Sequence, residues 1–159
     1  MKKNLKILLF SFMAVIITAV AGNLFTTRAV NSSWYQTIKP SITPPNFIFP
    51  IAWTTLFILM AFSLYLAYIS VKNIEEKKKI ALFYGINFFL NMLWSFLFFF
   101  LRRPDLAFFY IIFLWISILL ICVYTWKIEK KSSILFWPYL LWVSFATLLN
   151  YLSAFNILS

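Results

Sequence analysis

The chain is poor in the residue types that most enzymes use for chemistry. It has no histidine, one cysteine and four acidic residues among 159 residues. Without histidine, imidazole acid–base catalysis, a zinc centre and a histidine ligand to haem are excluded. The single Cys122 cannot form an internal disulfide, and because it lies in an apolar run we interpret it as a small packing residue. We therefore expect no metal site and no cofactor.

Charged residues are also scarce, at 11% of the chain against about 25% in ordinary soluble domains. Hydrophobic residues make up 64%, which is more apolar surface than a chain of this length can hide inside one globule. Crossing a bilayer takes roughly 20 apolar residues in a helix. Five windows without any charged residue reach that length: 7–27, 40–71, 80–101, 106–126 and 132–159.

These windows predict an all-α integral membrane protein, a single domain over residues 1–159 that forms a five-transmembrane-helix bundle. The predicted helices cover about 5–27, 46–71, 80–101, 104–126 and 134–157. The acidic residues Glu75, Glu76, Asp105 and Glu129 fall at or beyond the helix ends. A proton-coupled carrier usually keeps an ionisable group at membrane depth, so their position argues against that class of transporter.

The net charge of +10 does not indicate a nucleic-acid partner, because the basic residues flank the predicted spans instead of forming one patch. Ten lysines share one side of the membrane, and four cations lie on the other. The positive-inside rule then places the N-terminus in the cytoplasm and the C-terminus outside. The four cations of the outer side are Arg28, Lys39, Arg102 and Arg103.

The start of the chain has two interpretations. Three lysines within the first six residues, an apolar run and Ala19-Val20-Ala21 resemble a signal peptide, whose removal would leave four helices. The uncharged run is longer than the usual 7–15-residue apolar signal region. A retained helix explains better why small residues recur along one face, which suits close helix packing: Ser11, Ala14, Thr18 and Gly22.

The segment 28–45 is longer and more aromatic than a turn requires. It contains Trp34, Tyr35 and Lys39, and its three prolines stiffen the backbone. Loops of this length are often lids over a binding site. The alternative is an interfacial plug in which Trp34 and Tyr35 rest at the lipid headgroups, as we expect for Trp126 and Trp137 at the other side.

Polar and aromatic residues form stripes at helical spacing inside three of the spans. At about 1.5 Å per residue, Trp53, Asn91, Trp94 and Asn150 lie at one level in the outer half of the membrane. Aromatic walls with a few polar groups are typical of a ligand pocket, and a flat apolar ligand can stack on the indoles. Interhelical hydrogen bonding is an equal alternative for Asn91 or Asn150 taken singly. The stripes are Phe49, Trp53, Phe57 and Met60; Tyr84, Asn87, Asn91, Trp94 and Phe98; and Tyr139, Trp142, Ala146 and Asn150.

Spaced motifs over residues 34–151 make the chain resemble the TspO/MBR family, which comprises tryptophan-rich sensory proteins and the translocator, or peripheral-type benzodiazepine receptor, proteins. Each motif is weak alone, and the combination is specific. The motifs are Trp34-Tyr35, Lys39-Pro40, Pro44-Pro45, Phe49-Pro50, Trp53, Leu59-Met60, Leu90-Asn91-Met92-Leu93-Trp94-Ser95, Phe98-Phe99, Pro138-Tyr139-Leu140-Leu141-Trp142, Phe145-Ala146 and Asn150.

The resemblance implies a five-helix bundle in a bacterial cell membrane, commonly a homodimer, with a pocket for porphyrins such as protoporphyrin IX below the first loop. By motif position, Trp53 and Trp142 resemble the pocket tryptophans linked in bacterial relatives to light-dependent porphyrin degradation. Trp34, Asn91, Ala146 and Asn150 resemble pocket or lid positions. Asn87 stands where a glutamine is usual. No basic residue follows Tyr151, which leaves the proposed sterol motif incomplete and argues against sterol binding.

These observations lead to one hypothesis with two forms. A tetrapyrrole, or another flat hydrophobic ligand, stacks between Trp53 and Trp142 within a site that also includes Phe49, Asn87 and Trp94. Its acidic groups approach a cation at the rim such as Lys39 or Arg28. The protein is then either a pure binder or a photo-oxidative degrader that uses the two indoles in place of acid–base residues. A transporter, or a stress-related sensor of small hydrophobic ligands, is the alternative function.

Overall fold

The structure is a computed structural model that describes residues 2–155. Within these residues it is helical, and five helical segments are long and apolar enough to cross a membrane, which confirms the predicted five-helix bundle. The elements are α1 (Lys2–Thr26), α2 (Ser33–Ile38), α3 (Ile48–Ser70), α4 (Ile74–Ser95), the π-helical turn η1 (Phe96–Phe100), α5 (Pro104–Trp126) and α6 (Lys130–Ala154).

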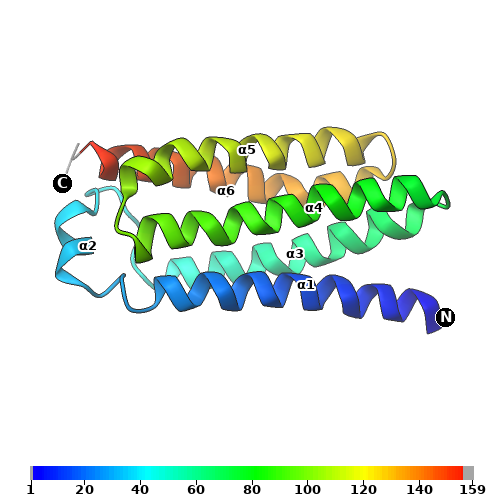
Figure 1. The fold of residues 1–159 in the computed structure, drawn as a ribbon, viewed down its shortest axis with the longest axis horizontal. Helices are drawn as coiled ribbons and strands as arrows, with labels where there is room; N and C mark the ends of the chain where they lie inside the picture. Colours follow the sequence, from blue (N-terminus) through cyan, green and yellow to red (C-terminus); the bar gives the residue numbers. More distant parts are fainter. Residues whose placement is uncertain (1, 156–159) are drawn as a thin grey trace.

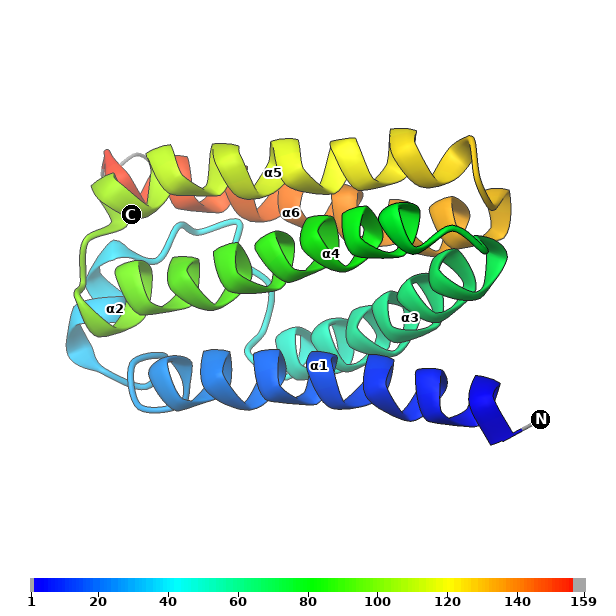
Figure 2. The same ribbon diagram turned by 45° about the vertical axis from the view of Figure 1, so that its right-hand side comes forward.

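The five long helices form a closed ring. α1 lies beside α3 and α4, α6 lies beside α3 and α5, and α4 and α5 complete the circle. Figures 1 and 2 show α2, the α4–α5 connection and the end of α6 at one end of the bundle, which we call the loop end. The start of α1 and the α3–α4 and α5–α6 turns lie at the opposite end, which we call the lysine end.

Two helices begin earlier than predicted because polar residues cap them. The Asn73 side chain accepts a hydrogen bond from the backbone N–H of Glu75, at 2.9 Å, so α4 begins at Ile74 rather than near residue 80. The Glu129 side chain caps α6 in the same way by accepting from the N–H of Lys131, at 3.1 Å. The prediction counted apolar residues only and missed these charged first turns. The predicted end of the last helix, at residue 157, lies outside the described residues.

The first connection contains a helix that the sequence pattern did not predict. The side chain of Ser32 accepts a hydrogen bond from the N–H of Tyr35, at 3.2 Å, and caps α2. Tyr35 of α2 is buried, and Trp34, the residue before it, packs on Phe98 of η1. The connection therefore packs against the loop end of the bundle instead of extending away from it.

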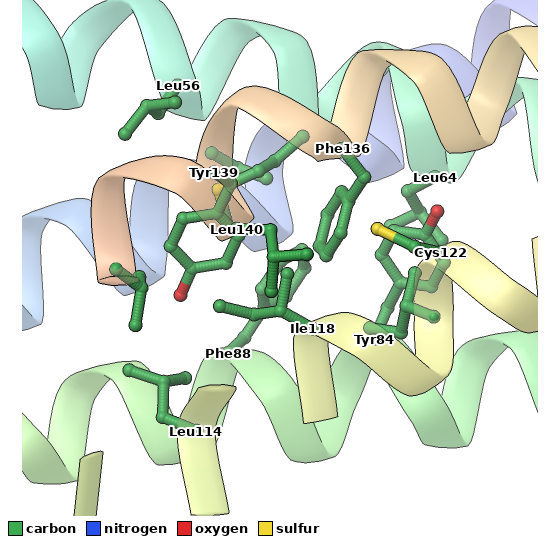
Figure 3. Packing of buried hydrophobic residues seen from close by; sticks show 14 of the residues in the cluster. Leu56, Leu64, Tyr84, Phe88, Leu114, Ile118, Cys122, Phe136, Tyr139 and Leu140 are labelled. Atoms are coloured by element: carbon green, nitrogen blue, oxygen red, sulfur yellow. The ribbon is translucent and has the colours of Figure 1, made fainter. Parts of the chain in front are cut away.

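The larger cluster of buried apolar residues extends from the middle of the bundle toward the lysine end. Figure 3 shows Phe136, Tyr139 and Leu140 projecting from α6 toward residues such as Phe88 and Ile118. Cys122 is buried in the same cluster, in agreement with a packing role. Large apolar side chains elsewhere on the ring face outward, as expected of a bundle that uses lipid as its solvent.

Three hydroxyls join α3, α4 and α6 inside this core. Ser63 and Ser132 each donate to the other's backbone carbonyl, both at 2.8 Å. The hydroxyl of Tyr84 lies 2.6 Å from Ser63 Oγ and, because the Ser63 proton is already used, donates to it. These three buried residues, which we call the hydroxyl clamp, satisfy one another without water.

The predicted small-residue face of α1 is mostly buried. Ser11, Thr18 and Gly22 are buried and Ala14 is half-buried, so α1 packs with this face toward the bundle. A Cβ atom at Gly22 would lie 3.5 Å from Ser95 Oγ, which shows how closely α1 approaches the end of α4.

Candidate ligand-binding site

Four aromatic rings from α3 and α6 form one wall in the half of the bundle nearer the loop end. Phe49 and Trp53 are one helical turn apart on α3, and Tyr139 and Trp142 are three residues apart on α6. Phe49 meets Trp142 edge to face with centroids 5.8 Å apart, and Trp53 meets Tyr139 at 6.1 Å. We call these four residues the aromatic wall. Ala146, one turn beyond Trp142, is half-buried beside them.

The two indoles of this wall differ from those that are tied into the bundle. Trp94 and Trp115 donate hydrogen bonds from Nε1, at 2.9 Å to Asn150 and 2.8 Å to Ser144. Within residues 2–155, Trp53 and Trp142 donate no side-chain hydrogen bond, and both are half-buried. Edge-to-face packing is the interaction that holds them, so a stacked ligand can replace it without breaking a hydrogen bond.

The amides of Asn91 and Asn150 bond other helices. Asn91 Nδ2 donates to the Tyr139 hydroxyl at 2.7 Å, which fixes the ring on which Trp53 rests. Asn150 Oδ1 accepts from Trp94, and its Nδ2 donates to the carbonyl of Pro104 at 2.7 Å. Both amides are buried. In this structure they hold α4, α5 and α6 together, so the interhelical role that we considered for each of them is observed.

Asn87 is different because half of its amide has no partner. Its Nδ2 donates to Ser117 Oγ at 2.8 Å, while its buried carbonyl oxygen Oδ1 has no hydrogen-bond partner among the described residues. An unsatisfied buried acceptor costs about 1–3 kcal/mol. Asn87 lies one turn before Asn91 on α4, so this open acceptor lies deeper in the bundle than the amide that holds Tyr139.

Trp34 of the first connection lies apart from the aromatic wall. The Trp34 ring packs on Phe98 at 6.1 Å, and Phe98 lies against Trp94 at 5.4 Å. The guanidinium of Arg102 lies over the Trp34 ring, 5.7 Å from its centroid. Lys39 follows α2 directly and is half-buried. The structure thus connects Trp34 to the Trp94 side of the predicted site and not to Trp53 or Trp142.

Two clefts within the described residues lie outside the aromatic wall. One, of about 310 Å³, opens between α5 and α6 and is lined by Ile112, Trp115, Ser144 and Thr147. The other, of about 480 Å³, lies between α1 and η1 and includes Arg28. Arg28, which we considered as a rim cation, therefore belongs to a different surface from Trp53 and Trp142.

Tyr139 is the site residue whose importance the sequence did not reveal. It was placed on the stripe of the last span, but its part in joining Trp53 to Asn91 depends on the positions of three helices. The hydroxyl clamp was also missed, although Ser63 and Ser132 inside or beside apolar runs were a usable signal. No group of three or more potential metal ligands occurs within residues 2–155.

Comparison with known proteins matches residues 10–155 to the TspO/MBR family model. The tryptophan-rich protein TspO of Archaeoglobus fulgidus is 38% identical over 149 residues, which cover 93% of this chain and 95% of that protein. Protein CrtK of Rhodobacter capsulatus is 33% identical, with 88% and 86% covered. The human translocator protein is 29% identical over 74% of this chain and 71% of its own length.

Proposed function

Because this chain belongs to the TspO/MBR family of membrane proteins, we propose that it is a membrane receptor for tetrapyrroles such as protoporphyrin IX, with the aromatic wall as its binding surface. The observation that carries the proposal is the pair of half-buried indoles, Trp53 and Trp142, that face each other's helices and donate no hydrogen bond within the described residues. A planar macrocycle gains stacking energy and apolar burial on such rings.

Binding requires the wall to open. Phe49 and Trp142 are in edge-to-face contact, so the macrocycle must replace this contact with its own face. Ala146 beside Trp142 offers a small side chain where a larger one would obstruct the ligand. The ligand's carboxylates then point toward the loop end, where Lys39 is the cation that remains once Arg28 is assigned to the α1–η1 cleft.

The floor of this site is polar but carries no charge. Asn91 holds Tyr139 in place, and the unpartnered Oδ1 of Asn87 accepts a hydrogen bond from a ligand donor or from a bound water. The chain has no histidine. Stacking and burial, not coordination of a metal, therefore account for the affinity in this proposal.

A fluorescence titration with protoporphyrin tests the site. We expect tryptophan emission to be quenched saturably near one ligand per chain. Trp142→Phe and Trp53→Phe are expected to weaken binding about two- to tenfold each, since phenylalanine offers a smaller stacking surface and an aromatic contact contributes about 0.5–1.5 kcal/mol beyond burial. Trp137→Phe, an exposed indole toward the lysine end, is the matched control. Equal affinity in all three variants would remove the aromatic wall from the proposal.

Light-dependent degradation is a second candidate, favoured by the position of two indoles without hydrogen bonds directly at the stacking surface. Illumination of the purified protein with protoporphyrin in air distinguishes a degrader from a pure binder. A degrader loses the porphyrin absorption and forms a new product band, and Trp53→Phe or Trp142→Phe stops this loss. A pure binder retains the porphyrin spectrum under the same light.

We further propose a homodimer whose lysine end faces the cytoplasm. The support for this orientation is that the α3–α4 and α5–α6 turns and the first residues of α4 and α6, which together carry most of the lysines, lie at one end (Figure 1). Labelling of a cysteine introduced at Lys72 or at Ser41 by a membrane-impermeant reagent in intact cells checks it. The Ser41 variant should react and the Lys72 variant should not.

A further inference from the structure

The cleft between α1 and η1 has a polar mouth and an apolar floor. Its volume is about 480 Å³, and its lining includes Arg28 and Arg102 together with Leu24, Phe25 and Phe100. It lies at the loop end, on the α1–α4 side of the ring, whereas the aromatic wall is built from α3 and α6. The two surfaces are therefore separate.

The mouth carries two positive charges that no acidic residue compensates. Arg28 and Arg102 are exposed, and neither forms an ion pair with a described residue. The neighbouring Arg103 shows the contrast, because its guanidinium holds Asp105 at 2.6 and 2.9 Å. Two unpaired guanidiniums that line one cleft are suited to an oxyanion, which they bind by charge-assisted hydrogen bonds.

The floor of the cleft is apolar and open toward the membrane. Leu24 is 72% exposed and Phe100 is 62% exposed. Phe25 packs edge to face on Phe96 and on Phe100, with centroids 5.3 and 5.8 Å apart, and makes the inner side of the cleft aromatic. A free phosphate would leave this surface uncovered, whereas an acyl chain would cover it.

Arg102 lines the cleft from a strained backbone conformation. After the wide turn of η1, the N–H of Leu101 bonds the carbonyl of Phe96 at 2.9 Å, and Arg102 adopts a φ of 55°. A left-handed conformation at a residue other than glycine costs about 1–2 kcal/mol. Strain of this kind persists where surrounding structure imposes it, and it often marks a binding site.

From this geometry we infer that the α1–η1 cleft binds a phospholipid whose headgroup carries a net negative charge. The headgroup phosphate lies between Arg28 and Arg102, and one acyl chain runs over Leu24 and Phe100 into the bilayer. This site does not depend on the porphyrin proposal, because it shares no residue with the aromatic wall.

Native mass spectrometry of the detergent-solubilised protein tests the inference. The protein is titrated with phosphatidylglycerol, with phosphatidylcholine of the same acyl chains, and with phosphatidylglycerol in the presence of inorganic phosphate at a comparable concentration. The variants are Arg28→Gln/Arg102→Gln, the charge-conserving Arg28→Lys/Arg102→Lys, and Lys72→Gln/Lys127→Gln. The last removes two exposed positive charges at the lysine end and is the matched control.

We expect phosphatidylglycerol to bind more tightly than phosphatidylcholine. Each basic residue near an acidic lipid contributes about 1 kcal/mol, so loss of both arginines weakens phosphatidylglycerol binding about 30-fold, at 1.4 kcal/mol per factor of ten. The lysine double variant retains most of the affinity and shows that the cleft is still folded. The control variant binds as the unmodified protein does.

Three results would overturn the inference. Equal affinity for the two lipids removes the preference for a net negative headgroup. An equal loss in the Lys72→Gln/Lys127→Gln control assigns the effect to overall charge. Displacement of phosphatidylglycerol by inorganic phosphate at a comparable concentration shows that the arginines bind a phosphate ion without any contribution from the apolar floor.

Discussion

The two halves of the bundle are held together in different ways. Toward the lysine end, the hydroxyl clamp and the fully buried Phe136 join α3, α4 and α6 with every clamp hydroxyl paired. Toward the loop end, Phe49, Trp53 and Trp142 of the aromatic wall are half-buried, and Arg102 is strained and has no ion pair among the described residues, while Asn87 near the middle of the bundle has an open acceptor. This difference divides the bundle along the membrane normal into a tightly packed lysine half and a loop half with incompletely buried side chains, and both binding proposals place their ligands in the loop half.

The largest effect that tests this division is expected for Phe136→Ala. Phe136 is fully buried between Tyr84 and Tyr139, so its truncation leaves a cavity and lowers the free energy of unfolding by about 3–5 kcal/mol. Equilibrium unfolding in detergent measures it. Phe113→Ala, which removes a ring that is 61% exposed on the outer surface, should cost far less in the same assay. A similar loss in both variants would contradict the division.

A smaller loss is expected for Trp94→Phe, because the loop half also contains one tightly bonded indole. Removal of its N–H leaves the buried Oδ1 of Asn150 without a donor, which costs about 1–3 kcal/mol. The same unfolding assay with Trp137→Phe, an indole without a hydrogen bond to the described residues, is the control. If the two variants lose equal stability, the Trp94–Asn150 bond does not contribute.

Tyr84→Phe tests how much the hydroxyl clamp contributes to the stability of the lysine half. It removes one hydrogen bond while Ser63 and Ser132 remain bonded to each other, so we expect a loss of about 1 kcal/mol in the free energy of unfolding. Tyr65→Phe, a half-buried tyrosine without a side-chain hydrogen bond to the described residues, should change it by less than about 0.5 kcal/mol. No difference between the two would mean that packing alone holds this half.

The smallest stability change is expected at the wall itself. Trp53→Phe keeps an aromatic ring beside Tyr139 and breaks no hydrogen bond, so it should shift the free energy of unfolding by less than about 1 kcal/mol while it weakens protoporphyrin binding. Unfolding and titration on the same preparation separate the two effects. A large stability loss with unchanged binding would assign Trp53 to the packed half.

The number and approximate position of the spans could be predicted because helices embedded in lipid lack charged residues, so each span appears in the sequence as a charge-free window. The helix starts could not, since Asn73 and Glu129 cap helices that extend beyond the apolar runs. The stripes placed Trp53, Asn91 and Trp142 on the correct helices. Which partner each residue meets depends on the order of helices around the ring, and no periodicity within a single helix contains that information.

Two features of the loop end were beyond sequence reasoning for a related reason. The wide turn η1 (Phe96–Phe100) is followed by a three-residue link to Pro104, and nothing in five residues of leucine and phenylalanine distinguishes it from a regular helix. Arg28 was predicted as a rim cation for the porphyrin. Its place in the α1–η1 cleft follows from how α1 ends against that turn.

Arg102 contributes to two surfaces at once, since its guanidinium lines the α1–η1 cleft and also covers the Trp34 ring of α2. An acidic lipid that draws this guanidinium away from Trp34 removes a cation–π attraction of about 0.5–1 kcal/mol from the cover of the bundle. Thermodynamic reciprocity then requires that any porphyrin which displaces α2 strengthens lipid binding by the same factor. If the porphyrin and lipid proposals both hold, the composition of the surrounding membrane becomes an effector of porphyrin binding, with Arg102 as the point of coupling.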